Sequence, residues 1–186
     1  DLPLYYFLTV NTTSINEETG LTDPVGFYIG EERDIFEKAV ALSQEVNIEK
    51  LEKPLSTVVV YLEKEEFTST WLGCKAIYRT RKAIKDGGRL IIIAPGLEKF
   101  GEDPQNDKLI RQYGYCGRSK ILELVEQKQD LRENLSVAAH LIHGSSEGRF
   151  EVEVAPGALS KQEIEKVNFK YRELDKTLDK FKVKQL

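Results

Sequence analysis

The chain has 186 residues, of which 40% are hydrophobic and 31% are charged, a composition typical of a globular protein that builds its own hydrophobic core. Its 27 lysine and arginine residues are outnumbered by 31 aspartate and glutamate residues, giving a formal net charge of −4, which argues against a general nucleic-acid-binding protein. The longest apolar runs, such as residues 90–94, are far shorter than a membrane-spanning helix, so we expect no membrane segment.

Two short strands and a helix are predicted at the start of the chain. Residues 4–10 are rich in aromatic and β-branched side chains, the pattern of a strand, and residues 25–30 repeat it after a polar, glycine-containing stretch. We expect these two strands to pair antiparallel as a hairpin. From Glu32 the apolar residues recur at helical spacing, which predicts a helix that ends before Pro54.

A strand–helix–strand unit follows. Residues 56–62 form a nearly continuous β-branched run, the pattern of a strand buried on both faces, and residues 89–94 form another apolar run. Between them we predict a helix over residues 69–85, stopped by Asp86-Gly87-Gly88 with glycine as its C-terminal cap. Such a unit is a right-handed crossover between parallel strands. The chain is therefore predicted to be an α/β protein, a three-layer Rossmann-like sandwich with a mostly parallel central sheet and an added N-terminal hairpin.

The remainder of the chain is predicted to be mostly helical. Apolar stripes and a capping-box pattern favour further helices at residues 106–113, 119–127, 131–142, from Ser160 onward and at 174–181. Residues 149–154 alternate strictly between apolar and polar, which predicts a half-exposed strand at a sheet edge. No internal repeat or linker is visible, so residues 1–186 are predicted to form a single α/β domain.

The cysteine and methionine content bears on the origin of the chain. Cys74 and Cys116 are too few for a disulfide framework or a zinc site, which fits a reducing, cytoplasmic location. The sequence contains no methionine, and we expect it to be one part of a longer polypeptide.

Ligands of an open α/β sheet bind beyond the carboxyl ends of the parallel strands, which here means residues 63–70 and 95–103. The first of these loops enters the predicted helix through Thr68, Ser69 and Thr70. Hydroxyl and backbone N–H groups at the start of a helix can hold a carboxylate or a phosphate. The alternative is an ordinary helix N-cap without a ligand.

Lys75 lies one to two turns into the same predicted helix, on a face that it shares with Trp71 and Leu72. A lysine at this place can hold a substrate carboxylate as a mobile point charge, and the alternative is a solvated surface lysine. The glycines of the second loop, within residues 95–101, allow either the close approach of a ligand or a tight turn.

Three other residue types deserve separate interpretations. His140 and His143 stand three residues apart, either as a metal-binding pair or as structural histidines, and no third ligand or H-E-x-x-H pattern accompanies them. Ser145 lies in a glycine-containing segment without the context of a nucleophile elbow. Cys74, beside Lys75, is either a reactive thiol or small core filling.

The segment from Lys75 to Gly101 resembles the C-terminal domain of the nickel-dependent lactate racemase family. The residues that carry the resemblance are Lys75-Ala76-Ile77, the run from Lys82 to Asp86-Gly87-Gly88, the apolar strand 90–94, Glu98 and Gly101. The stretch 27–31 before a helix is also similar to the start of that domain. The resemblance spans most of the chain at low similarity, with this one well-matched block.

The resemblance implies a role for Lys75. Full-length members of the family have two α/β domains with the active site between them. Their N-terminal domain carries a nickel pincer nucleotide and two catalytic histidines, and their C-terminal domain holds the substrate. By position Lys75 matches the substrate-holding lysine and is the implied catalytic residue. The substrate-binding residues that we assign around it are Thr68, Ser69 and Thr70, from the predicted helix start, and Glu98 and Gly101, from the block that resembles the family.

The resemblance also implies partners. These are the N-terminal cofactor-binding domain of the same polypeptide and a small-molecule 2-hydroxy acid. The nickel pincer nucleotide is not expected to be bound by this chain alone, and His140 and His143 do not correspond to the catalytic histidines of the family. The chain departs from the family pattern at Leu72, where the family has glutamine, and at residues 98–101, where the family has Glu-Gly-x-Gly.

Several functions therefore stay open. The first is the substrate-side domain of a 2-hydroxy acid racemase or epimerase, inactive by itself. The second is a non-catalytic ligand-binding or assembly domain that kept the fold and lost the site, which Leu72 favours. A stand-alone hydrolase that uses Ser145 and His143 is a third.

Overall fold

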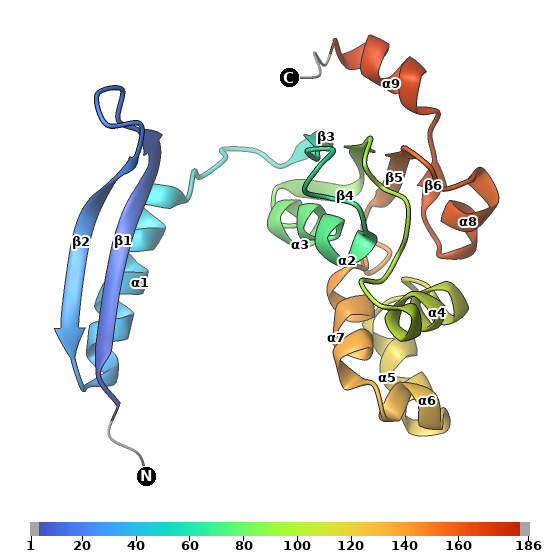
Figure 1. Ribbon diagram of the computed structural model, residues 1–186, viewed down its shortest axis with the longest axis horizontal. Coiled ribbons are helices and arrows are strands. Elements are labelled where there is room, and N and C mark those ends of the chain that lie inside the picture. Colours follow the sequence, from blue (N-terminus) through green and yellow to red (C-terminus); the bar gives the residue numbers. More distant parts are fainter. Residues whose placement is uncertain (1–3, 183–186) are drawn as a thin grey trace. The chain divides into compact units, whose positions relative to one another are not determined.

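The computed structural model describes residues 4–182, which form two compact units, residues 4–52 and residues 53–182 (Figure 1). We call these the N-terminal unit and the C-terminal unit. Within the described residues no helix is both long enough and apolar enough to cross a membrane.

The N-terminal unit is a β-hairpin with one helix packed on it. Strands β1 (Tyr6–Ile15) and β2 (Thr22–Gly30) pair antiparallel, and helix α1 spans Arg33–Asn47. Gly26 of β2 leaves room for Leu42 of α1, because a Cβ atom there would lie 2.5 Å from a Leu42 methyl carbon. The hairpin and the helix that the sequence predicted are thus confirmed.

The two faces of the hairpin differ in burial. Alternate residues of a strand point to opposite faces, and Tyr6, Leu8 and Val10 lie on the better-buried face, toward α1. The opposite face carries Phe7 and Phe27, which are 67% and 63% exposed. The N-terminal unit therefore presents apolar side chains on one side of its sheet.

The C-terminal unit is built on a four-stranded parallel sheet in the order β3-β4-β5-β6. The strands are β3 (Leu55–Tyr61), β4 (Ile84–Ala94), β5 (Glu151–Pro156) and β6 (Lys170–Tyr171). Since each new strand joins the same edge, right-handed crossovers place the connecting helices on one face of the sheet. The connecting helices are α2 (Thr70–Gly73), α3 (Lys75–Thr80), α4 (Pro104–Tyr113), α5 (Arg118–Gln127), α6 (Gln129–Arg132), α7 (Leu135–His143) and α8 (Lys161–Lys166).

The last helix, α9 (Leu174–Phe181), contacts β4 and β5 and lies on the opposite side of the sheet from α3, α4 and α7 (Figure 1). The main core lies on the side of the connecting helices, where Leu90 and Ile92 of β4 meet Val154 of β5. Ile91 and Ile93 are buried as well, and by alternation they point to the α9 side. The predicted three-layer α/β sandwich with a parallel sheet and an N-terminal hairpin is confirmed.

The helix predicted over residues 69–85 is different. It is two short helices, separated at Cys74 (φ −64°, ψ −8°) and ending at Thr80, and β4 already begins at Ile84. The prediction that Gly87 caps a helix is wrong: with φ 71° it lies inside β4, where the pairing with β3 shifts in register between Leu55 and Thr57. At this irregularity the four residues 85–88 lie opposite a single residue of β3, Ser56. The helix predicted at 131–142 is likewise divided, into α6 and α7.

The structure places β3 at an edge of the sheet and β5 in its interior, the reverse of what their sequence patterns predicted. The β-branched run of β3 predicted burial on both faces, but β3 is the edge strand and Val59 remains exposed. The alternating run of β5 predicted an edge, but β5 lies between β4 and β6 and is buried from Val152 to Pro156. The Glu153 carboxylate can be buried in this interior strand because it accepts a hydrogen bond from the Arg172 guanidinium.

Candidate functional site

The two loops expected to form a site do lie together beyond the carboxyl ends of β3 and β4. Their backbones pair in parallel at an isolated bridge between Ser69 and Lys99. The hydrogen bonds run from the N–H groups of Thr70, Trp71 and Glu98 to the carbonyl groups of Lys99 (3.1 Å), Phe100 (2.9 Å) and Thr68 (3.0 Å), respectively. The sequence therefore predicted this juxtaposition correctly.

The donors at the start of α2 are all used by the chain itself. Besides the N–H groups of Thr70 and Trp71, that of Leu72 donates to the Ser69 hydroxyl oxygen at 3.3 Å. The Ser69 hydroxyl in turn donates to the Glu102 carboxylate, and the Thr70 hydroxyl donates to the Phe100 carbonyl at 2.9 Å. Ser69 and Thr70 are buried. A ligand carboxylate has no open N–H group at this helix start, so Ser69 and Thr70 act here as structural links between the loops.

The glycines of the second loop make room for the chain rather than for a ligand. A Cβ atom on Gly96 would lie 2.0 Å from the Lys64 carbonyl oxygen, and one on Gly101 would lie 2.2 Å from the Asp107 backbone nitrogen. The Asp107 carboxylate accepts the N–H groups of Phe100 (2.7 Å) and Gly101 (3.2 Å). Of the two interpretations of these glycines, the tight turn holds. Glu98 on the same loop is exposed.

Lys75 is the first residue of α3, directly after the interruption at Cys74, and is half-buried. Among residues 4–182 its ammonium group makes no ion pair. The segment that carries it runs along α7. At one end the Trp71 ring stacks on the His140 ring with centroids 4.5 Å apart, and at the other the Tyr78 ring meets the His143 ring edge-on at 6.3 Å. Lys75 lies between these two contacts along the chain, with its charge available to a ligand.

A chain of buried hydrogen bonds lies beneath Trp71. The Tyr115 hydroxyl is 2.7 Å from the Thr70 hydroxyl oxygen and 2.8 Å from Nε2 of His140. The Tyr115 ring stacks on Phe169 at 4.5 Å, and its side chain is almost completely buried. This chain ties α2, the segment after α4, and α7 to one another.

Burial sets the protonation states of this cluster. It raises the pKa of Tyr115 well above its usual value of 10 and raises the pKa of Cys74 to about 12, so both groups stay protonated. Burial, with a smaller contribution from the nearby His143, lowers the pKa of His140 to about 4, so its imidazole is neutral near pH 7. Cys74 is therefore core filling, one of the two interpretations that its position allowed.

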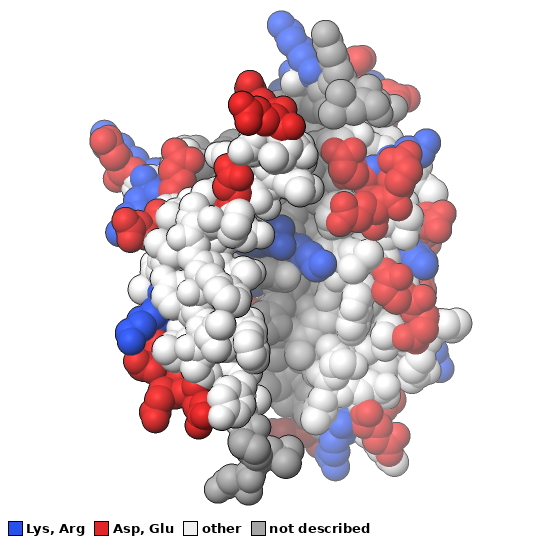
Figure 2. Space-filling view, turned by 60° about the vertical axis from the view of Figure 1, so that its left-hand side comes forward, with Lys and Arg blue, Asp and Glu red and all other residues white. Residues whose placement is uncertain are grey.

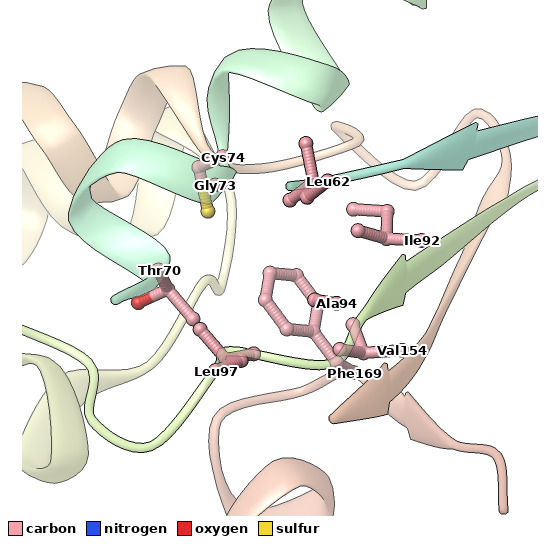
Figure 3. Close-up of a pocket in the computed structure, with 9 residues that line it drawn as sticks. All are labelled: Leu62, Thr70, Gly73, Cys74, Ile92, Ala94, Leu97, Val154 and Phe169. Carbon is pink, nitrogen blue, oxygen red and sulfur yellow. The ribbon is translucent and has the colours of Figure 1, made fainter. Parts of the chain in front are cut away.

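A small apolar cavity separates the loops from the sheet. Figure 3 shows side chains from α2, β4, β5 and the loop after β4 gathered around it. They are Leu62, Thr70, Gly73, Cys74, Ile92, Ala94, Leu97, Val154 and Phe169. Its free space is about that of a single water molecule. A hydroxy acid does not fit there, so this cavity is not a candidate substrate site.

The remaining candidates do not assemble into a site. Ser145 is buried, and its hydroxyl oxygen accepts the N–H group of Glu147 at 3.1 Å. Within residues 4–182 it forms no hydrogen bond to His143, and no group of three or more metal-ligating side chains could hold a metal ion. The hydrolase interpretation thus has no nucleophile–base pair. On the face shown in Figure 2, basic and acidic side chains are interspersed without a continuous basic area.

Tyr115 is the residue of this region that the sequence did not single out. It stands between two glycines of positive φ, Gly114 and Gly117, in a segment without helical or strand periodicity. Only the folded chain brings its hydroxyl to Thr70 and His140, so no local pattern indicated its place.

Solved structures that are similar to this chain include two proteins of known source. A protein from Thermotoga maritima, known from a crystal structure, shares 27% identity with a TM-score of 0.70, over 92% of this chain and 43% of that one. The lactate racemase apoprotein from Thermoanaerobacterium thermosaccharolyticum shares 14% identity with a TM-score of 0.59, over 89% of this chain and 38% of that one. The chain therefore has a lactate-racemase-like fold and spans less than half the length of either protein. No protein-family model and no curated protein sequence matches it.

Proposed function

We propose that this chain is the substrate-side domain of a 2-hydroxy acid racemase or epimerase, in which Lys75 holds the carboxylate of the substrate. The observation that carries the proposal is the similarity of fold to the lactate racemase apoprotein over 89% of this chain. With it stands a half-buried lysine near the carboxyl ends of the parallel strands that makes no ion pair with residues 4–182. Ligand sites of open α/β sheets gather at that end.

The proposed partner is a companion domain of the same polypeptide that carries the cofactor, in the cytoplasm. Support for it comes from the solved structures, which extend well beyond the region that this chain covers. The nickel pincer nucleotide is assigned in this proposal to the companion domain. The proposed share of this chain is to bind and orient the hydroxy acid. That the two compact units act as a single domain stays a prediction.

The binding of lactate to the chain tests the proposal. We expect L-lactate to bind to the 186-residue protein, and the substitution Lys75→Ala to weaken this binding by about fivefold, because the variant loses the only charge assigned to the carboxylate. Lys82→Ala is the matched control, since Lys82 is an exposed lysine two residues beyond the end of α3. The measurement is an NMR titration with isotopically labelled protein. Equal binding by the wild type and Lys75→Ala would contradict the proposed role of Lys75.

The activity is tested on the full polypeptide. We expect it to interconvert the enantiomers of a 2-hydroxy acid when its companion domain is loaded with cofactor, and Lys75→Ala to lower that rate while Lys82→Ala does not. Racemisation is followed by polarimetry or chiral chromatography. A Lys75→Ala variant of unchanged rate would show that the reaction does not use this lysine.

The second candidate is a binding or assembly domain that lost the site. Two observations favour it: every N–H group at the start of α2 is bonded within the chain, and the apolar Leu72 stands one turn before Lys75. This candidate predicts that the full polypeptide has no racemase activity and that lactate does not bind to the chain.

A further inference from the structure

The hydrogen-bond chain beneath Trp71 favours one tautomer of His140. The Thr70 hydroxyl donates its proton to the Phe100 carbonyl. The Tyr115 hydroxyl donates its own proton to Thr70, and in this arrangement its oxygen accepts a proton from Nε2 of His140. The neutral imidazole consequently carries its proton on Nε2, and Nδ1 keeps a lone pair.

The Nδ1 atom of His140 is an acceptor without a hydrogen-bond partner in the described part of the chain. It forms no hydrogen bond among residues 4–182. It does not belong to the side-chain atoms that lack a hydrogen-bond partner and are also shielded from solvent. It therefore reaches the surface. One face of the ring is covered by the Trp71 indole, so the exposed part of the imidazole is an edge beside that indole.

The free acceptor and Lys75 belong to segments that pack on each other. The Trp71–His140 and Tyr78–His143 contacts hold the α2–α3 segment along α7 at both ends, and Lys75 lies between these contacts along the chain, just after the interruption at Cys74. A cationic donor on α3 and a neutral acceptor on α7 are thus both available where these segments meet. A 2-hydroxy acid offers the complementary pair, a carboxylate and an adjacent hydroxyl donor.

We propose that Nδ1 of His140 accepts a hydrogen bond from the hydroxyl group of the 2-hydroxy acid whose carboxylate Lys75 holds, with the Trp71 indole as the apolar wall between them. The inference rests on the proposed function and deepens it, because it makes the hydroxyl group the feature that distinguishes a substrate from a simple carboxylic acid. Tyr115 and Thr70 are positioning residues in this arrangement: they orient the imidazole and do not touch the ligand.

Two substitutions of His140 test the roles of its two ring nitrogen atoms separately. His140→Gln places an amide N–H near the position of Nε2 and keeps the bond to Tyr115, but it removes the acceptor at Nδ1. His140→Asn places an amide oxygen near Nδ1 and loses the bond to Tyr115. We expect His140→Gln to lose the preference for a hydroxyl group and His140→Asn to keep it at lower stability. Lys75→Ala should weaken the binding of both acids, whether residue 140 is His, Gln or Asn.

The experiment uses the 186-residue chain with L-lactate and propionate, which differ at C2 by the hydroxyl group. The ring-nitrogen NMR shifts of the wild type report the tautomer, and titrations report the ratio of the two dissociation constants. We expect the Nε2–H tautomer and a preference for lactate of about fivefold, the value of one neutral hydrogen bond of about 1 kcal/mol. His140→Gln should reduce this ratio to about one.

Each contrary result has a distinct meaning. An Nδ1–H tautomer, equal affinities of the wild type for the two acids, or an unchanged preference in His140→Gln would overturn the role of His140. If Lys75→Ala still weakens both acids in that case, the proposed function stands without this inference. If neither acid binds to the wild type, both fall together. The tautomer is measured on the wild-type protein, so this part of the test does not depend on whether a variant folds.

Discussion

Removal of the Tyr115 hydroxyl tests whether the buried hydrogen-bond chain holds α2 and α7 together. Tyr115→Phe keeps the ring that stacks on Phe169 and removes only the oxygen that meets Thr70 and His140. Tyr115 is 5% exposed, so water replaces the lost partner poorly. The Nε2–H group of His140 then has no acceptor, and an unpaired buried polar group costs roughly 1–3 kcal/mol.

The expected destabilisation is therefore about 2 kcal/mol, because Thr70 keeps its other bond, to Phe100. With a denaturant slope of about 2 kcal/mol per molar urea, the midpoint of unfolding should fall by about 1 M. The assay is urea denaturation followed by tryptophan fluorescence, which is suited to this region because the only tryptophan of the chain, Trp71, lies against His140.

Tyr171→Phe is the matched control. Tyr171 packs against the same core, and its hydroxyl makes no hydrogen bond among residues 4–182, so its removal should change the midpoint by less than about 0.3 M. An equal effect of the two substitutions, or an unchanged midpoint for Tyr115→Phe, would refute the argument that the Tyr115 hydroxyl links the two helices.

Two further predictions concern stability. The pKa of His140 is about 4 in the folded chain, below the value near 6.5 of an unfolded chain, so the folded form binds fewer protons. The free energy of unfolding should therefore fall by about 3 kcal/mol as the pH drops from about 6.5 to 4. The urea midpoint of His140→Gln should fall less over this range than that of the wild type, and equal falls would contradict a buried neutral imidazole. Ser160→Ala should lower the free energy of unfolding by about 1 kcal/mol, because the Ser160 hydroxyl accepts a hydrogen bond from the N–H group of Glu163 at the start of α8. The control Ser136→Ala, at an exposed position of α7, should leave the urea midpoint unchanged. Equal midpoints for the two variants would argue against the helix cap.

Local patterns predicted the elements of this fold better than their places in it. The capping box at Ser160 acts within four residues, so its sequence signature and its structure coincide. The exposure of β3 depends on which strands lie beside it. Val58, Val59 and Val60 would suit an interior strand as well as an edge strand, and only the strand order decides between them.

The irregular segment between α3 and β4 shows a second limit. Asp86-Gly87-Gly88 is a sensible helix stop when read alone, and the chain instead uses it as a bulge. The N–H group of Gly87 donates to the Arg149 carbonyl at 2.7 Å, more than 60 residues away in the sequence. A long-range bond of this kind decides the local conformation without leaving any periodic signal.

The loops of the candidate site have one feature that the sequence predicted and one that depends on long-range contacts. Parallel strands place their carboxyl ends together, so the meeting of Ser69 with Lys99 followed from the predicted crossover. How the loops use their polar groups did not follow, because it depends on partners such as Glu102 and Asp107 that approach only in the folded chain. Residues that looked free to bind a ligand are therefore partly occupied by each other.

This occupation limits how tightly the chain alone can hold an acid. With the N–H groups of α2 already bonded, the ligand carboxylate gains only the half-buried ammonium of Lys75, and a single ion pair near the surface contributes about 1 kcal/mol or less. A hydrogen bond to His140 adds about 1 kcal/mol. The sum of about 2 kcal/mol corresponds to weak binding, with a dissociation constant of roughly tens of millimolar. The informative quantity is consequently the ratio between lactate and propionate, which depends on the hydroxyl group alone and not on the contacts that a companion domain would add.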